Sequence, residues 1–143
     1  MLKKTALSLI FSVMAAMAFA QSDCLLVVVH NLRSTSGVVR YALYNENNTF
    51  ASYTDVLREG VAEVKSGTVR ILICDLPDTD YGICLLHDEN NDGDMNFNAL
   101  GIPKEGFGFS NDAKVHLSPP KFNACRFIKK GETAIRVKMR YML

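Results

Sequence analysis

The sequence predicts an all-β fold, an antiparallel β-sandwich of about seven strands that carries one long ordered loop. Three observations predict it. Short runs of β-branched and other apolar residues recur along the chain, turn residues separate them at short intervals, and no long stretch shows the period of a helix. The chain length suits one domain with one hydrophobic core.

Residues 1–20 predict a cleaved signal peptide. Lys3 and Lys4 form a short basic start, an apolar run follows over residues 6–19, and the segment AFA at 18–20 supplies a cleavage pattern of small residues. The run is too short to span a bilayer comfortably. We therefore expect an exported protein, periplasmic or extracellular, whose single sandwich domain is residues 21–143.

Net charge limits the classes of partner. Removing Lys3 and Lys4 changes the formal charge from +1 to −1. This excludes a general electrostatic attraction to nucleic acid or to an anionic membrane surface. We expect no nucleic-acid partner and no membrane span, and a protein or carbohydrate ligand stays open.

Seven segments have the composition of strands. In the last one, Ile135, Val137 and Met139 alternate with basic residues, as expected for a half-buried strand. Residues 51–60 instead have a helical spacing of apolar residues, which predicts one short helix. The expected strands are 24–32, 37–45, 61–65, 68–76, 81–88, 124–130 and 133–143.

Four cysteines, Cys24, Cys74, Cys84 and Cys125, lie in the exported part. An even number in an oxidising compartment predicts two disulfides, for which three pairings exist. The absence of a C-x-x-C pair disfavours a zinc site. If 68–76 and 81–88 form a hairpin across PDTD, Cys74 and Cys84 lie nearly opposite each other, which favours Cys74–Cys84 and leaves Cys24 with Cys125.

Residues 89–121 contain no convincing strand and several glycines and prolines. Loops of this length in a compact domain are usually functional or disordered. Met95, Phe97 and Leu100 give the segment apolar surface to bury, which disfavours disorder. We expect an ordered loop that packs over one end of the sandwich.

This loop and its flanks resemble a known family. The segments HDENNDGDMNFNALGIPKEGFGFSNDA (87–113) and PPKFNACRF (119–127) are similar to the signature of the secreted bacterial family called domain of unknown function 2141. The resemblance implies an exported sandwich of the immunoglobulin or transthyretin type with no established activity. Asp92 and Asp94 make this loop more acidic than the family's commoner asparagine-rich version, and the cysteines are not part of its pattern.

The acidic start of the loop predicts a calcium site. The segment DENNDG at 88–93 has the spacing of a D-x-N-x-D-G calcium loop. The glutamate that usually ends such a loop is Ala99 here, so Glu105 would have to fold back to complete the shell. The competing hypothesis is an Asx-rich turn whose side chains bond their own backbone amides. The candidate ligands are Asp88, Asn90, Asp92, Asp94 through its carbonyl, Asn96 and Glu105.

Two other function classes stay open. An enzyme would use His87 and the loop carboxylates as acid–base groups, but no nucleophile motif accompanies them, so we assign no catalytic residue and disfavour an enzyme. A carbohydrate- or protein-binding module would present Phe107 and Phe109 on its surface. The competing hypothesis is that both rings turn inward as the loop's own small core.

Overall fold

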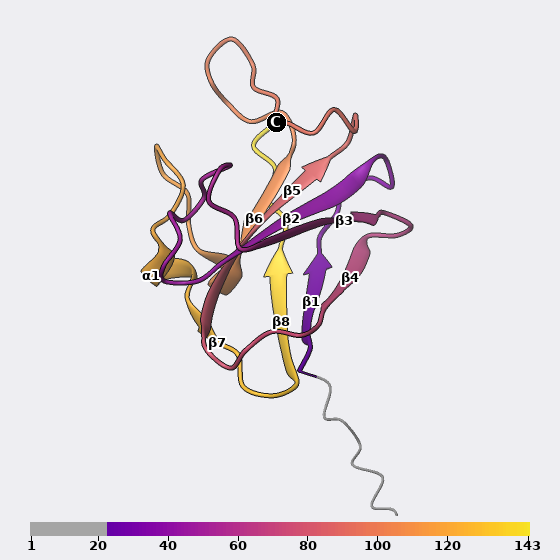
Figure 1. Cartoon of the computed structure of the whole chain (residues 1–143). Coiled ribbons are helices and arrows are strands. Elements are labelled where there is room, and N and C mark those ends of the chain that lie inside the picture. The colour runs from indigo at the N-terminus through magenta and orange to yellow at the C-terminus, as the bar shows by residue number, and fades with distance from the viewer. Residues whose placement is uncertain (1–22) are drawn as a thin grey trace, which may run out of the picture.

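The computed structural model describes residues 23–143 and confirms an all-β chain. The predicted signal peptide at 1–20 lies outside the described residues. Eight strands form two sheets, which share one hydrophobic core (Figure 1). Helical residues in the described part are confined to η1 (Ser110–Asp112) and α1 (Phe122–Cys125).

The smaller sheet has β1 (Leu25–His30) at its centre, between β4 (Thr68–Ile73) and β8 (Thr133–Lys138). β1 and β4 are antiparallel. β1 and β8 are parallel, with Leu25 opposite Thr133, so the prediction of a purely antiparallel sandwich is wrong for this pair. A parallel pair needs a long connection, and the rest of the chain supplies it between the first strand and the last.

The larger sheet is antiparallel throughout. Four strands lie side by side in it, and a short fifth strand pairs with the beginning of β5. The strand order is β3 (Arg58–Glu63), β2 (Val38–Tyr44), β5 (Asp80–Asp88) and β6 (Gly106–Phe109), with β7 (Phe127–Ile128) paired to β5.

Three local predictions are wrong. The strand expected at 124–130 is reduced to Phe127–Ile128, because the residues before it form the end of α1. Residues 51–60 form no helix and lead instead into β3. Residues 106–109, predicted as loop, form β6. Glycine is depleted in strands, which is why GFGF carried no strand signal. Here Gly106 is needed, because a Cβ at this position would lie only 2.4 Å from the ring of Tyr141.

The core follows the predicted alternation of apolar residues. On β1 the side chains of Leu25, Val27 and Val29 are fully buried, while the residues between them are partly exposed. Burial of this apolar surface is the main term that stabilises the fold. Within the described residues, every buried member of the core lies between residues 25 and 139. Other core residues are Val39, Leu43, Val69, Ile71, Ile73, Ile83, Leu85, Val137 and Met139.

A disulfide joins the ends of β1 and β4. Leu25 lies opposite Ile73 in this antiparallel pair, so the next residues outward, Cys24 and Cys74, also lie opposite each other. Their Cα atoms are 3.9 Å apart and their sulfur atoms are bonded. The bond therefore links the start of β1 covalently to the end of β4.

The predicted pairs Cys74–Cys84 and Cys24–Cys125 are wrong. They depended on a hairpin across PDTD, but β4 and β5 belong to different sheets, and this segment crosses from one sheet to the other. Cys84 and Cys125 are free thiols. Burial raises the pKa of both thiols, that of Cys125 to about 12.

Replacing Cys24 and Cys74 together by alanine should lower the free energy of unfolding by about 2 to 4 kcal/mol, because the bond links residues 50 positions apart and restricts the unfolded chain. Urea titration measures the loss. Cys84→Ala is the control, since it removes a thiol but no cross-link, and should cost about 1 kcal/mol. A non-reducing peptide map that joins Cys74 to Cys84, or Cys24 to Cys125, would contradict the assignment.

Candidate metal-binding site

The loop between β5 and β6 carries the candidate site. Figure 1 shows this loop extending beyond the end of the sheets, next to the C-terminus. The first side chain of the site belongs to Asp88, at the end of β5. The final one belongs to Glu105, directly before β6. The loop therefore begins and ends on neighbouring strands of the larger sheet.

The sheet itself brings Asp88 and Glu105 together. His87 is paired with Gly106 across β5 and β6, and continuing this antiparallel register by one residue places Asp88 opposite Glu105. Directly opposite residues have Cβ atoms about 5 Å apart and share a face of the sheet. The fold-back of Glu105 that the calcium hypothesis requires thus follows from strand register.

Asp88 is fully buried and is held from two directions. Arg40 of β2 donates from Nε to Oδ2 at 2.5 Å. From the loop, the backbone N–H of Asp92 donates to Oδ1 at 3.1 Å, and that of Gly93 donates to Oδ2 at 2.9 Å. Gly93 has a φ of +93°, a conformation that suits glycine and turns the loop back over Asp88.

Gly37, which precedes β2, packs directly against the backbone of Asp88. A Cβ at this position would lie 1.9 Å from the backbone oxygen of Asp88, and the residue has a φ of +66°. Only glycine lets the chain before β2 pass so close to the end of β5. The backbone of Asp88 is therefore covered by protein as well as its side chain.

Asp92 is the exposed member of the site and is oriented by amides. The N–H of Asp94 donates to its Oδ1 at 3.0 Å, and the side chains of Asn96 and Asn90 each donate to its Oδ2 at 2.9 Å. These hydrogen bonds, that from Asp94 foremost, lower the pKa of Asp92 below its usual value. The carboxyl is therefore charged and fixed in direction.

Glu105 completes a cluster of three carboxylates. It is 4% exposed, and its two oxygens accept hydrogen bonds from the N–H groups of Glu89 at 2.9 Å and Asn96 at 3.2 Å. One oxygen each from Asp88, Asp92 and Glu105 lies within 4.8 Å of the other two. Of the predicted ligands, Asn90 and Asn96 border this cluster through Asp92, whereas the Asp94 side chain is outside it.

The cluster concentrates negative charge that the protein only partly offsets. Of the described residues, Arg40 alone forms an ion pair with one of the three carboxylates. Like charges placed directly opposite on a sheet are destabilising, and buried charges need partners. Oxygen atoms at this spacing are suitable ligands for a hard divalent cation.

Glu89 belongs to a separate ion pair beside the cluster. Arg33 donates to both of its carboxylate oxygens, and Ser34 donates to Oε1 at 2.7 Å. The hydrogen bond from Arg33 is the main cause of the lowered pKa of Glu89. Arg33 also lies over the Tyr141 ring, 4.6 Å from its centroid, and so ties the loop to the C-terminal segment.

His87 is a structural residue in this fold. It is fully buried, with Nδ1 2.7 Å from the hydroxyl of Tyr141 and Nε2 2.9 Å from the carbonyl oxygen of Ser36. Since a carbonyl only accepts, Nε2 carries a proton and donates it to Ser36. Both ring nitrogens are therefore hydrogen-bonded within the protein.

Phe107 and Phe109, the predicted binding surface, do not form an exposed aromatic pair in the structure. Phe107 is 8% exposed, and Phe109 is partly buried and packs against Phe50 and Phe107. Both residues lie on β6, which pairs with β5, so they are held in the sheet rather than on a mobile tip. Phe107 therefore turns inward, and the ring of Phe109 contacts those of Phe50 and Phe107.

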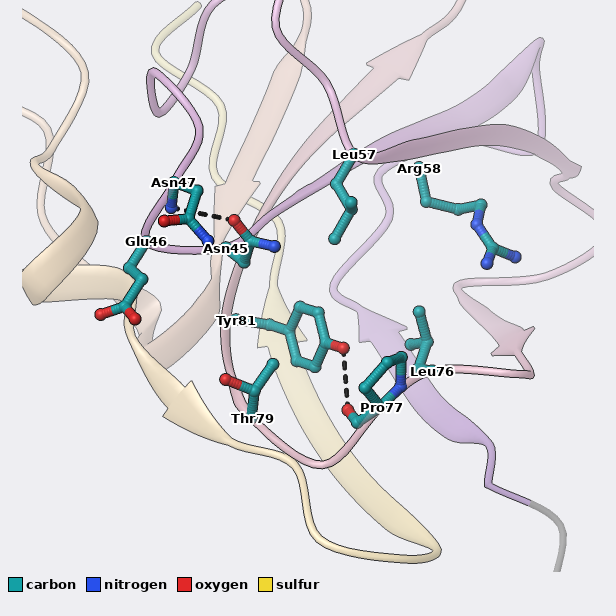
Figure 2. A pocket seen from close by; sticks show the side chains of 9 residues that line it. All are labelled: Asn45, Glu46, Asn47, Leu57, Arg58, Leu76, Pro77, Thr79 and Tyr81. Carbon is teal, nitrogen blue, oxygen red and sulfur yellow. Dashed lines mark hydrogen bonds between the residues drawn. The ribbon is translucent and has the colours of Figure 1, made fainter.

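Two cavities lie at opposite ends of β5. The one near its start has a volume of about 270 Å³ and is shown in Figure 2. Tyr81 forms part of its lining, but the hydroxyl already donates to the carbonyl of Pro77 at 2.8 Å. Figure 2 shows the charged ends of Glu46 and Arg58 on opposite sides of the Tyr81 ring. The other cavity, of about 600 Å³, adjoins the carboxylate cluster and includes Glu105 in its wall.

Comparison with known proteins identifies the family. A family model described as "Uncharacterized protein conserved in bacteria (DUF2141)" matches residues 27–136. The chain belongs to this family. The DUF2141 region begins in β1 and ends in β8, and it includes all three clustered carboxylates. No curated protein and no solved structure matches the chain. Within residues 23–143, the structure has no helix of the length and apolar character needed to cross a membrane.

Three residues that build the site, Arg40, Gly37 and Arg33, were not predicted from the sequence. Arg40 had a usable signal, because a charged residue within the apolar strand GVVRYALYN requires a partner. Gly37 and Arg33 had none, since their roles depend on how the chain before β2 crosses the end of β5.

Arg40→Met should lower the free energy of unfolding by roughly 3 kcal/mol, because it leaves the buried carboxylate of Asp88 without its cation. Chemical denaturation measures the loss. Arg136→Met, at an exposed position of β8, should cost no more than about 0.5 kcal/mol. Adding Asp88→Asn to Arg40→Met should recover part of the loss, and equal losses in the two arginine variants would contradict the role of Arg40.

Glu89→Gln should reduce stability in a pH-dependent way. The folded-state pKa of Glu89 is lowered from 4.5, so its charged form stabilises the fold above that pH, and this contribution is lost as the pH falls through the folded-state value. The difference in unfolding free energy between wild type and variant should therefore be largest above pH 4.5 and shrink in more acidic buffer. Glu63→Gln removes an exposed carboxyl paired with Lys65 and should show no such trend; a constant offset for Glu89→Gln would contradict the assignment.

Proposed function

We propose that this protein is a non-catalytic binding module whose acidic loop, residues 88–105, holds a Ca²⁺ ion. One observation carries the proposal: oxygens of Asp88, Asp92 and Glu105 lie within 4.8 Å of one another, and two of these side chains are buried. A divalent cation would offset the repulsion among them.

The donor set favours calcium over other metals. It consists of carboxylate, amide and carbonyl oxygens, without histidine nitrogen or cysteine sulfur, which disfavours zinc. Mg²⁺ demands near-ideal octahedral geometry, whereas Ca²⁺ accepts about six to eight oxygens in a flexible shell. We assign the shell to the side chains of Asp88, Asn90, Asp92, Asn96 and Glu105 and to the backbone carbonyl of Asp94.

The competing hypothesis is that the hydrogen bonds alone account for the loop. Backbone N–H groups bond all three carboxylates, as in an Asx-rich turn. In a calcium loop the same carboxylates can accept such bonds with one lone pair and bind the ion with another, because each has about four acceptor sites. The two hypotheses are therefore separated by a metal titration.

We also infer an exported sandwich of the immunoglobulin or transthyretin type. The two sheets around one core support the sandwich. The Cys24–Cys74 bond supports an oxidising compartment, as does the signal-peptide pattern of residues 1–20. Protease accessibility of the protein in intact cells of its host tests the location.

Calcium should raise the melting temperature of residues 21–143, and chelator should reverse the effect. With a Kd on the order of 0.1 to 1 mM, as in extracellular modules, calcium at about a hundredfold excess over Kd adds about 2.7 kcal/mol to the free energy of unfolding. Differential scanning calorimetry measures the shift. Asp92→Asn should abolish most of it without exposing a buried group, because Asp92 is the exposed member of the cluster.

Asp94→Asn is the matched control for charge and position. Asp94 lies in the same loop, but its side chain is outside the cluster, so this variant should keep the calcium shift. Mg²⁺ at the same concentration controls for ionic strength. Equal melting temperatures in calcium and chelator, or equal shifts in the two variants, would remove calcium binding at this site.

A further inference from the structure

The larger cavity opens beside the carboxylate cluster. It is a shallow depression, open to solvent, with a volume of about 600 Å³. Most ligand pockets have a predominantly apolar lining, but this one combines hydroxyl, carboxylate and ammonium groups with a single aromatic ring. Such a wall suits a ligand rich in hydrogen-bonding groups. The wall includes Ser34, Ser36, Glu89, Phe97, Lys104 and Glu105.

Phe97 is held with its ring exposed. Its backbone forms a β-bridge with Pro103, and the N–H of Asn98 donates to the carbonyl of Ile102 at 2.9 Å, so a short hairpin fixes its position. The side chain is 56% exposed, and every other phenylalanine in residues 23–143 is more deeply buried. A fixed exposed ring forfeits burial but provides a rigid stacking surface with little entropy to lose on binding.

The polar groups of the wall are balanced between donors and acceptors. Glu89 is neutralised by Arg33. The ammonium group of Lys104 makes no hydrogen bond or ion pair with the described residues, so it is free to donate. Glu105 keeps acceptor sites beyond its two backbone partners. Hydroxyl groups, which both donate and accept, match such a wall.

Other ligand classes fit less well. An apolar molecule would remove water from the exposed Lys104 without replacing its hydrogen bonds. A phosphate-rich ligand would meet the carboxylate of Glu105, which has no ion-pair partner among the described residues, with Lys104 as the one ammonium group in the wall. A neutral polyhydroxylated ring replaces the lost hydrogen bonds and carries no charge to be repelled. Its apolar face can also stack on an aromatic side chain.

We propose that this cavity binds a neutral saccharide, with Phe97 stacking on one sugar ring and Lys104 donating to a hydroxyl. The inference rests on the proposed function in one respect. A Ca²⁺ ion held by Asp88, Asp92 and Glu105 takes about six to eight oxygens, and neighbouring sugar hydroxyls at the edge of the cavity replace its water ligands. The aromatic surface expected at Phe107 and Phe109 thus has a counterpart at Phe97.

Saturation-transfer NMR on residues 21–143 with methyl glycosides of glucose, galactose and mannose, in calcium and in chelator, tests the proposal. At least one glycoside should receive saturation, and calcium should strengthen it. Phe97→Ala should weaken binding about tenfold or more, and Phe97→Trp should preserve it because the larger ring still stacks. Leu100→Ala is the matched control, since Leu100 is 83% exposed on the same hairpin and lies outside the cavity wall.

The outcomes separate this proposal from calcium binding. If calcium raises the melting temperature but no glycoside receives saturation, the saccharide site is wrong and the calcium site stands. If a glycoside binds in chelator and Phe97→Ala removes the signal, the cavity is a saccharide site without calcium. Binding that survives Phe97→Ala, or that is lost equally in Leu100→Ala, overturns the proposal. Saturation only of methyl glucuronide, added as an anionic arm, also overturns the neutral class.

Discussion

The buried carboxylate of Asp88 is the interaction on which the loop and the candidate site depend. A fully desolvated charge is tolerated only with partners, and the chain supplies them from separate parts of the sequence: Arg40 on β2 and the backbone of Asp92 and Gly93 in the loop. Asp88 therefore joins the sheet to the turn that follows it. The direction of the loop is set where β5 ends.

Arg33 provides the second attachment. Its guanidinium donates to Glu89 at the start of the loop, to the carbonyl oxygen of Lys104 at its end, and to the carbonyl oxygen of Leu143. Ordering a long loop costs conformational entropy for every residue, and a planar group with five donors can offset part of this cost at three places at once. These contacts hold both ends of the loop between β5 and β6 in place, although the loop contains no named strand or helix.

The sequence predicted what depends on local periodicity. Alternation located the core strands, and the spacing of Asp88, Asn90 and Asp92 located the acidic loop. Features that depend on the pairing of segments distant in the sequence were not predicted. Cys24 pairs with Cys74 because β1 neighbours β4, a fact of topology that no cysteine spacing contains. β6 was missed since its glycines, which make room for Tyr141, also weaken the strand pattern. The role of Glu105 was uncertain for the same reason, because it follows only once β6 is known to pair with β5.

The pairing of β5 with β6 lowers the stability of the folded state at this site. Two carboxylates placed opposite each other in neighbouring strands repel, and one of them is also covered by Gly37. An apolar pair at these positions would stabilise the sheet end with less difficulty. The chain instead orients each carboxylate with backbone amides and leaves oxygens that converge. Because the sheet register and the Arg40 contact have already ordered and desolvated these groups, an ion that binds them loses little to reorganisation. The carboxylates thus lie at strand ends, where the sheet register and backbone amides fix their positions.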